Sequence, residues 1–436
     1  MSLQGAETKK LFERAAKVIP HGVNSNFRDW GPKDTLVVTR AEGAYLWDAD
    51  GKRYIDYRLG FGPIILGHSY PQVVEKVSEA IRRGTTPAWT TPLEIEVAER
   101  ICRMCGVDKV RLANSGTEAT MHALRIARAH TGREKFIKFE GQYHGMVDYF
   151  MFSTAGTSTA DLEQAGEPAN VRKSKGIPDA IRDYVVNLPF NDLERVAREL
   201  ESNGHQIAAI FVEPIMGNVA SIMPAEGWLE GLRALCDEHG VVLVFDEVKT
   251  GFRVANGGAQ ELFGVRADLV TYAKALGNGF PIAAVAGKDE IMMNIGPGET
   301  AHGGTYSGNS VGVAAASATL ELLENEPIIE TIRQRGHLLM SGIGEVFSDA
   351  GIPHALSGVP AMFGISLGLD RAPTDLRSYN KSDEQLYERI GMKLSELGVQ
   401  PDADGREPWF LSYSHSEADV TETLSALETA IKEVKH

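Results

Sequence analysis

A lysine stands at the end of an apolar run, where lysine side chains are uncommon. Lys274 comes soon after Leu269–Tyr272 and precedes the glycine-containing turn Gly277–Gly279. In apolar or cationic surroundings an amine loses proton affinity, and a neutral amine can form a Schiff base with an aldehyde. For a single lysine, a stem on apolar surface with its head in water is commoner. A chemical role for Lys274 therefore requires evidence from other segments of the sequence.

Two carboxylates end another apolar run. Asp246 and Glu247 follow Val241–Phe245. A buried acid needs a partner, and Asp246 would be well placed to pair with the protonated nitrogen of a pyridine ring. A magnesium site or a solvated turn is an equally good explanation of this acid pair taken alone.

Two glycine-containing turns add further candidates. Ser115, Gly116 and Thr117 lie between the apolar run Val110–Ala113 and a helix that ends near His130. Free N–H groups at such a helix start attract phosphate, although simple capping by Ser and Thr is the commoner role. Tyr143 stands in a second turn and could stack on a planar ring, or it could pack within the turn.

The elements that must position these residues read as an α/β domain. From Glu75 onwards, apolar runs alternate with helical stretches such as Trp228–Glu238, a pattern typical of buried parallel strands and their crossovers. The carboxyl ends of parallel strands meet at one edge of a sheet, where ligands bind. We therefore expect a large α/β domain over residues 70–310, with a mostly parallel central sheet.

Smaller units are expected on both sides of this domain. Residues 1–69 predict a helix over 7–19, an irregular polar loop and an antiparallel hairpin. Residues 311–436 predict a smaller α+β unit. Ser158–Lys175 is the least periodic stretch and predicts a mobile surface loop.

Composition excludes several classes of partner. The formal net charge of −15 argues against nucleic acid, which is bound by clustered Lys and Arg. Three cysteines fit a reducing compartment, so the cytoplasm is expected, and core packing is favoured over redox or metal chemistry for Cys102 and Cys105. No window has the roughly 18–20 apolar residues that span a bilayer, so no membrane partner is expected.

Together the segments resemble the class III, fold type I aminotransferases that depend on pyridoxal 5′-phosphate. The likeness runs from about Leu11 to Val434, with the motifs in the same order. They are Ala44–Gly51, Ser115–Ala119, Tyr143–Gly145, Val212–Ile215, Asp246–Val248, Ala273-Lys274 and Gly303–Tyr306. The resemblance implies the pyridoxal-phosphate transferase fold, with the smaller α+β domain built from both chain ends.

The resemblance also implies a role for each matching residue. Lys274 corresponds to the catalytic lysine that holds the cofactor, which alternates with pyridoxamine 5′-phosphate. The other cofactor residues implied are the phosphate cradle Ser115, Gly116 and Thr117, the ring contacts Tyr143 and Val248, the ring-nitrogen partner Asp246, and Glu213 and Asn218 beside the ring hydroxyl. Thr305 would reach the phosphate of a neighbouring subunit, which implies a homodimer with active sites at the interface. No metal site is expected.

Within the class, the likeness is greatest to the glutamate-1-semialdehyde 2,1-aminomutase group. Arg28 and Ser25 resemble parts of that group's substrate loop, and Glu407 matches an acid near its active site. Arg28 could bind a substrate carboxylate bidentately; outside this resemblance, a surface ion pair is the commoner use of a loop arginine. Phe61, Trp89 and Ala155–Lys175 depart from the group's pattern at positions near the substrate.

These features favour amino-group transfer on a small carboxylate-bearing substrate, of the aminomutase type. The departures keep open a transaminase that uses a β-, ω- or D-amino acid with a keto-acid acceptor. A racemase or epimerase is a further alternative. A protein that keeps the scaffold without turnover is also considered, although all the matching catalytic positions are present.

Overall fold

The computed structural model describes residues 3–166 and 168–435. The α-helices are α1 (Ala6–Ala16), α2 (Pro71–Arg83), α3 (Pro92–Cys105), α4 (Gly116–Thr131), α5 (Thr159–Ala165), α6 (Leu193–Asn203), α7 (Trp228–His239), α8 (Gly258–Phe263), α9 (Asp289–Met292), α10 (Ser310–Asn325), α11 (Ile328–Asp349), α12 (Leu376–Tyr379), α13 (Glu384–Glu396) and α14 (Glu417–Lys435). The strands are β1 (Val38–Glu42), β2 (Tyr45–Asp48), β3 (Arg53–Asp56), β4 (Lys109–Ala113), β5 (Lys135–Phe139), β6 (Val185–Leu188), β7 (Ile207–Val212), β8 (Val242–Asp246), β9 (Leu269–Tyr272), β10 (Ala283–Gly287), β11 (His354–Val359), β12 (Met362–Leu367), β13 (Val399–Gln400) and β14 (Trp409–Phe410).

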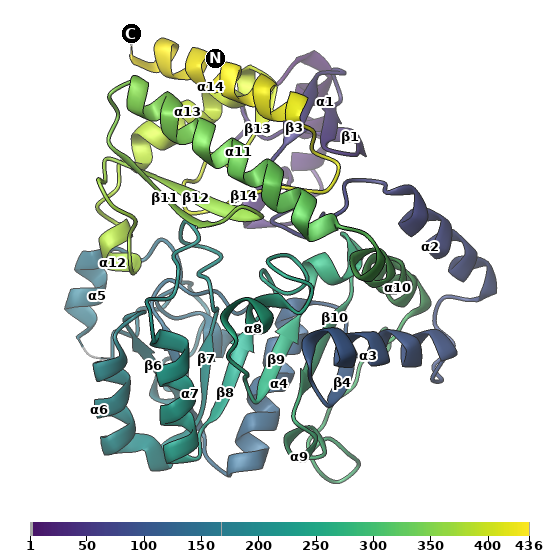
Figure 1. Cartoon of the computed structure of the whole chain (residues 1–436), viewed down its shortest axis with the longest axis vertical. Helices are drawn as coiled ribbons and strands as arrows, with labels where there is room; N and C mark the ends of the chain where they lie inside the picture. Colours follow the sequence, from purple (N-terminus) through teal and green to yellow (C-terminus); the bar gives the residue numbers. More distant parts are fainter. Residues whose placement is uncertain (1–2, 167, 436) are drawn as a thin grey trace.

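A seven-stranded sheet forms the centre of the large unit, in the order β4-β10-β9-β8-β7-β5-β6. Strands β9, β8, β7, β5 and β6 are paired in parallel. Helix α4 packs behind this sheet, while α3, α7 and α8 lie in front of it (Figure 1). The fold is α/β with a mostly parallel sheet, as the alternating pattern predicts.

One strand of the sheet runs against the others. Strand β10 is antiparallel to both of its neighbours, β9 and β4. Because β10 is antiparallel to both neighbours, β4, which includes Val110–Ala113, runs in the same direction as β9 without pairing to it. The pattern of apolar runs does not identify β6 or β10, since short apolar runs resemble buried helix segments.

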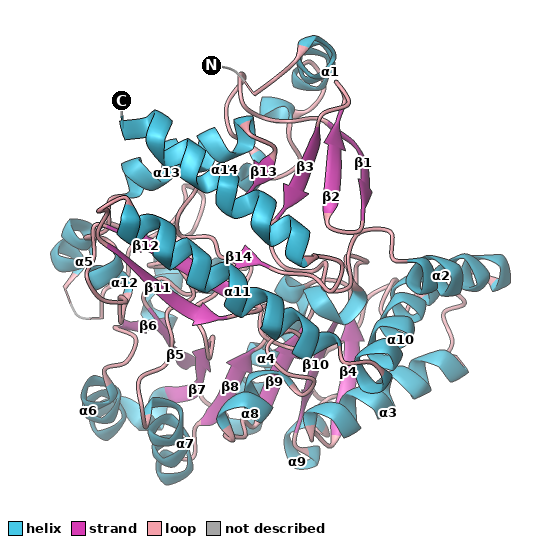
Figure 2. Ribbon diagram, turned by 45° about the horizontal axis from the view of Figure 1, so that its top comes forward, coloured by secondary structure: helices cyan, strands magenta, loops and turns pink. Residues whose placement is uncertain are grey.

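The smaller unit combines both ends of the chain. Strands β1, β2 and β3 form an antiparallel ribbon, and β13 from the C-terminal part pairs in parallel with β3. Figure 2 shows β1 to β3 beside α13 and α14, above the large sheet. Strands β11, β12 and β14 form a separate three-stranded sheet. Two distant segments thus share one structural unit.

A buried arginine joins these parts. Arg253 is fully buried, and its guanidinium donates hydrogen bonds to the carbonyl oxygens of Gly62, Ala361 and Leu411. Burial lowers the pKa of Arg253 to about 9. Because the three acceptors come from different parts of the chain, Arg253 fixes the loop after β3 and the C-terminal unit against the large domain.

The prediction of an irregular loop over Ser158–Lys175 is wrong for its first half. Helix α5 begins after Ser158, whose hydroxyl accepts a hydrogen bond from the Asp161 N–H at 3.1 Å. Leu162 is fully buried in the core. One apolar contact and one cap therefore order a segment that is too short to show helical periodicity.

No helix within residues 3–166 and 168–435 is long and apolar enough to cross a bilayer. In the same residues, no cluster of three or more His, Cys, Asp and Glu side chains could hold a metal ion.

Candidate active site

A cavity of about 310 Å³ lies where the parallel strands end. Its wall includes nine of the residues singled out from the sequence: Ser115, Gly116, Thr117, Tyr143, Glu213, Asn218, Asp246, Val248 and Lys274. These residues follow β4, β5, β7, β8 and β9, and strand order alone brings them together. The structure therefore brings these nine residues to one cavity.

Lys274 occupies an unusual backbone conformation beside this cavity. It starts a single 3₁₀ turn directly after β9, and its φ of 49° lies in the left-handed region. Such conformations are costly for residues other than glycine and cluster at functional sites. Burial lowers the pKa of Lys274 to about 7, and the positive charge of Lys249 lowers it further. Near neutral pH a large share of this amine is therefore unprotonated.

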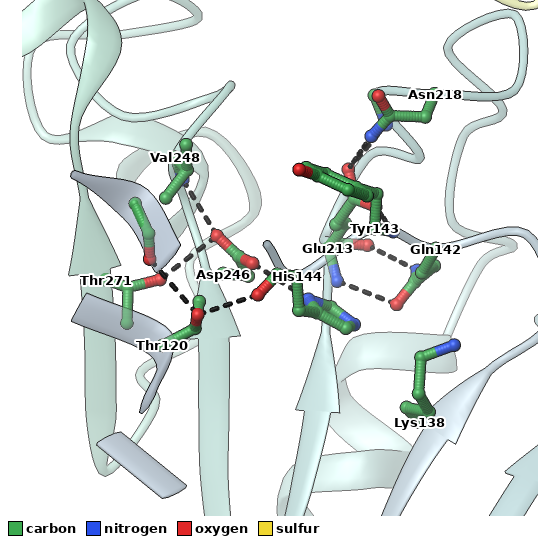
Figure 3. A network of polar contacts seen from close by, with 12 residues as sticks. Thr120, Lys138, Gln142, Tyr143, His144, Glu213, Asn218, Asp246, Val248 and Thr271 are labelled. Carbon is green, nitrogen blue, oxygen red and sulfur yellow. Dashed lines mark hydrogen bonds and ion pairs between the residues drawn. The ribbon is translucent and has the colours of Figure 1, made fainter. Parts of the chain in front are cut away.

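Asp246 is buried at the end of β8 and is held by three neighbours. Its Oδ1 accepts hydrogen bonds from the Thr271 hydroxyl at 3.0 Å and the Val248 N–H at 3.1 Å. Its Oδ2 lies 2.8 Å from Nδ1 of the buried His144. Figure 3 shows this network between the strands. The carboxylate is thus fixed in orientation beneath the cavity.

His144 is a further residue of this site, and the sequence alone predicts no role for it. Its ring packs edge-on against Phe150 and Phe211, with centroids 5.4 and 5.9 Å away. Its carbonyl oxygen accepts a hydrogen bond from Thr120 of α4 at 2.7 Å. The signal that could have found it is its place in the Tyr143-His144-Gly145 turn, but pairing with Asp246 requires strands that are distant in sequence.

The start of α4 forms a cradle for an anion. Gly116 and Thr117 begin the helix, where backbone N–H groups have no partner within the helix. Ser115 caps the helix by accepting from Glu118 N–H at 3.2 Å. The Thr117 hydroxyl accepts from Met146 N–H at 3.2 Å, which ties the cradle to the turn that carries Tyr143. A phosphate group suits this helix start.

Glu213 anchors the opposite side of the cavity. Its carboxylate accepts hydrogen bonds from Tyr143 N–H at 2.6 Å and Gly217 N–H at 2.8 Å, and Asn218 Nδ2 approaches it at 3.4 Å. Burial raises the pKa of Glu213 above its usual range and raises that of Tyr143 to about 12. The Tyr143 phenol therefore stays neutral.

Glu407 is connected to the cavity by Lys249, a residue for which no role is predicted from the sequence. Its Oε2 lies 2.8 Å from Nζ of Lys249, and Lys249 lines the cavity. Lys249 stands three residues after Asp246, so its neighbourhood is visible in the sequence. Its ion pair with Glu407 is not, because the two residues are 158 positions apart.

The residues expected at the substrate lie beside a second cavity. Arg28 and Phe61 line a larger space of about 1090 Å³, together with Trp30, Arg58 and apolar residues of α1. Phe27 links the two cavities, since its ring lies 5.8 Å from that of Tyr143 and 6.1 Å from that of Phe61. Ser25 precedes this loop and is not among the residues lining either cavity.

Two of the predicted residues lie on the surface, away from the cavity wall of their own chain. Trp89 is 84% exposed, and Thr305 is also exposed. Their segments are connected, because the Ser310 N–H donates to the carbonyl oxygen of Thr85 at 2.9 Å. Within the part of the chain that the structure describes, neither residue lines the cavity that holds Lys274.

The cavity matches the chemical parts of pyridoxal 5′-phosphate. The start of α4 suits its phosphate, the buried Asp246 suits a protonated ring nitrogen, and Lys274 supplies an amine for its aldehyde. Tyr143 and Val248 line the same space as flat and branched apolar surfaces. The residues present therefore fit this cofactor.

Comparison with known proteins agrees with this fit. The Aminotransferase class-III family matches residues 28–428. A glutamate-1-semialdehyde 2,1-aminomutase of Methanopyrus kandleri is 41% identical over 98% of this chain and 97% of that protein. An omega-transaminase of Sphaerobacter thermophilus superposes with a TM-score of 0.92 at 30% identity, covering 99% of this chain and 98% of that one. A transaminase with pyridoxal phosphate bound gives 0.88 at 28% identity, covering 99% of both chains.

The fold and the site define an enzyme that depends on pyridoxal 5′-phosphate and transfers amino groups. The chain belongs to the class-III aminotransferase family.

Gly116 gives a first test of the cradle. A methyl group there would lie 3.0 and 3.1 Å from the two Val248 methyls, tighter than most such contacts, so the Val248 side chain would have to shift by a few tenths of an ångström. We expect Gly116→Ala to raise the dissociation constant for pyridoxal phosphate about 10-fold, since overpacking costs about 1–3 kcal/mol. Equilibrium binding followed by absorbance measures this change.

Gly296→Ala is the matched control, because a methyl group there meets no atom within 4 Å. It should bind the cofactor as the unchanged protein does. The same crowding against Val248 acts on the cofactor-free protein, so circular dichroism before cofactor is added checks that Gly116→Ala is still folded at the temperature of the binding measurement. Unchanged affinity in this variant would contradict the assignment of the cradle.

Proposed function

We propose that the enzyme moves an amino group within glutamate-1-semialdehyde, as an aminomutase does. The observation that carries this proposal is the 41% identity to an aminomutase over nearly the whole of both chains. Ser115, Tyr143, Asp246 and Lys274, expected from the same resemblance, all line one cavity. A substrate of this kind is small and carries a carboxylate, for which Arg28 is the proposed partner.

In this proposal each residue has a defined task. Lys274 is the catalytic residue: its neutral amine would hold the cofactor at its aldehyde, and its Nζ would hold and move a proton at the substrate carbon. Asp246, oriented by His144, would hold the proton on the ring nitrogen. When bound, the cofactor ring supplies a sink for the electrons that the substrate carbon releases.

The remaining residues bind and orient. Ser115, Gly116 and Thr117 would hold the phosphate, and Tyr143 and Val248 would confine the ring. Glu213 and Asn218, joined at 3.4 Å, would hold the ring hydroxyl. Glu407 acts near the substrate through its ion pair with Lys249.

The enzyme is proposed to work as a homodimer. Exposed apolar side chains, among them Trp89 and Tyr306, lie on the connected segments 84–89 and 303–310. Large exposed apolar residues mark interaction sites. In the dimer, Thr305 of one copy would reach the phosphate in the other, and Trp89 would approach the substrate. The three free cysteines are consistent with the proposed cytoplasmic location.

A transaminase acting on a β-, ω- or D-amino acid is the second candidate. The observation that favours it is the cavity of about 1090 Å³ behind Arg28 and Phe61, with apolar residues such as Phe12 and Trp30 in its wall. This space exceeds what a five-carbon substrate fills. The structural likeness to an omega-transaminase agrees with this reading.

The aminomutase and the transaminase are distinguished by where the amino nitrogen goes: it stays in the product of an aminomutase and passes to a keto acid in a transaminase. Protein loaded with pyridoxamine phosphate is given glutamate-1-semialdehyde, with no other amino donor and no keto acid, and 5-aminolevulinate is measured. Repeated turnover under these conditions supports the aminomutase. Absence of that product, with keto-acid-dependent consumption of a β-, ω- or D-amino acid, supports the transaminase. Exchange of the substrate's α-hydrogen without nitrogen transfer would indicate a racemase or epimerase instead.

A further inference from the structure

Lys249 is held in place by three oxygen atoms. It is only 6% exposed, and its ammonium donates to Glu407 Oε2 at 2.8 Å, to Asn218 Oδ1 at 3.0 Å and to the Gly217 carbonyl oxygen. An ammonium has three protons to donate, and these contacts use all of them. The positive charge therefore has a fixed position.

This fixed charge and the Lys274 amine belong to the same cavity. Lys249 and Lys274 both line its wall, at the ends of the neighbouring strands β8 and β9. The carboxylates that act on Lys274 are Glu407, Glu213 and Asp246, and Lys249 is the cation that opposes them. After burial, Lys249 has the largest effect on the pKa of Lys274, and it lowers that pKa.

We infer that Lys249 is a positioning residue that places a fixed positive charge beside Lys274 and thereby favours the neutral, nucleophilic form of the Lys274 amine. The inference rests on the proposed role of Lys274 as the lysine that holds the cofactor. Two cations in one poorly solvated cavity repel, and the less strongly hydrogen-bonded of the two loses its proton more readily. Three acceptors stabilise the charge on Lys249, so Lys274 is the amine that loses its proton.

Glu407 sets the strength of this effect. Its carboxylate cancels part of the Lys249 charge and by itself favours protonated Lys274. Loss of Lys249 leaves an unpaired Glu407, and both changes favour protonated Lys274. Loss of the Glu407 charge leaves Lys249 unopposed and favours the neutral amine. The two substitutions break the same ion pair but act on Lys274 with opposite signs.

The experiment measures the protonation of Lys274 directly in the full-length, cofactor-free protein. Trace acetic anhydride labels neutral amines, and mass spectrometry of the Lys274 peptide gives the labelling as a function of pH, with the exposed Lys9 as internal reference. Lys249→Met should raise the labelling midpoint by about one pH unit, so the neutral fraction at pH 7 falls about fivefold. Glu407→Gln should lower the midpoint by a similar amount, so labelling at pH 6 rises about fivefold.

The double variant Lys249→Met/Glu407→Gln removes both charges, and its midpoint should lie between those of the two single variants. Lys52→Met is the matched control, because Lys52 is held by the carbonyl oxygens of Ser395 and Glu396 outside the cavity. This control should leave the midpoint unchanged.

Cofactor uptake provides a second readout. The rate at which each cofactor-free protein takes up pyridoxal phosphate should follow the neutral fraction of Lys274, so it falls in Lys249→Met at pH 7 and rises in Glu407→Gln at pH 6. Midpoints that move in the same direction in both single variants would show a purely structural ion pair and overturn the inference. Unchanged midpoints would also overturn it.

Failure of the proposed role of Lys274 gives a different result. Borohydride reduction of the loaded protein would then place the cofactor on another residue, while the labelling midpoints of Lys274 would still respond to Lys249 and Glu407. The two outcomes are therefore separable.

Discussion

Lys274→Ala should lower the rate of amino transfer by on the order of 10³–10⁴-fold while the protein stays folded. The substitution removes the amine that bonds to the cofactor aldehyde and the group that carries the proton at the substrate carbon. It also relieves the left-handed backbone strain only slightly, since alanine shares the penalty for a φ of 49°. The loss is therefore expected in the chemistry, with little change in stability.

Two measurements check this expectation. Single-turnover kinetics give the rate, and borohydride reduction followed by mass spectrometry shows whether cofactor is joined to the chain. Lys274→Arg is the informative control, because it keeps a positive charge but cannot become neutral at ordinary pH. Both variants should lose activity alike and retain no cofactor after reduction. Activity above one tenth of the original in Lys274→Ala would refute the assignment.

The pH dependence of the unchanged protein follows from the same amine. The pKa of Lys274 is lowered to about 7, so its neutral form is scarce below that pH and predominates above it. The rate of pyridoxal phosphate uptake should therefore rise as the pH increases through about 7 and then level off. A lysine with an ordinary pKa would instead show an increase up to about pH 10.

Asp246→Asn should lower the rate of the proton-transfer step about 10²–10³-fold, a loss of the size seen when one preorganised polar contact to developing charge is removed. Asparagine has almost the same shape and can still accept from Thr271 and Val248 through its oxygen. It carries no charge to hold a proton on the ring nitrogen. The electron-withdrawing form of the ring is then disfavoured.

The neighbouring carboxylate provides the control for Asp246. Glu247 is fully buried and accepts from Thr250, Ala259 and Gln260, and it is not among the residues that line the cavity. Burial raises its pKa to about 7. Glutamine replaces one of the accepting oxygens with an NH₂ donor, so Glu247→Gln should reduce thermal stability, with less than a tenfold effect on rate. If Asp246→Asn and Glu247→Gln slow the reaction equally, the special role of Asp246 is wrong.

The central residues could be identified from the sequence, because each is marked by its type and by its position at the end of an apolar run. Asp246 ends an apolar strand with a charge, Lys274 follows the end of another, and Ser115, Gly116 and Thr117 start a helix soon after a third. Parallel strands align their carboxyl ends, so residues in separate segments can be assigned to one edge of a sheet before any contact is known. The combined unit built from both chain ends required the family resemblance in addition.

Other features were decided only by tertiary structure. The antiparallel direction of β10, the pairing of His144 with Asp246 and the clamp of Lys249 by Glu407 each depend on partners from distant segments. The opening of Arg28 and Phe61 onto a second cavity depends on how the N-terminal loop packs against α1 and β3. A sequence specifies which groups can react, because residue type and strand position are local. The protonation state and orientation of those groups depend on burial and on charges brought close by folding, and neither has a local signal.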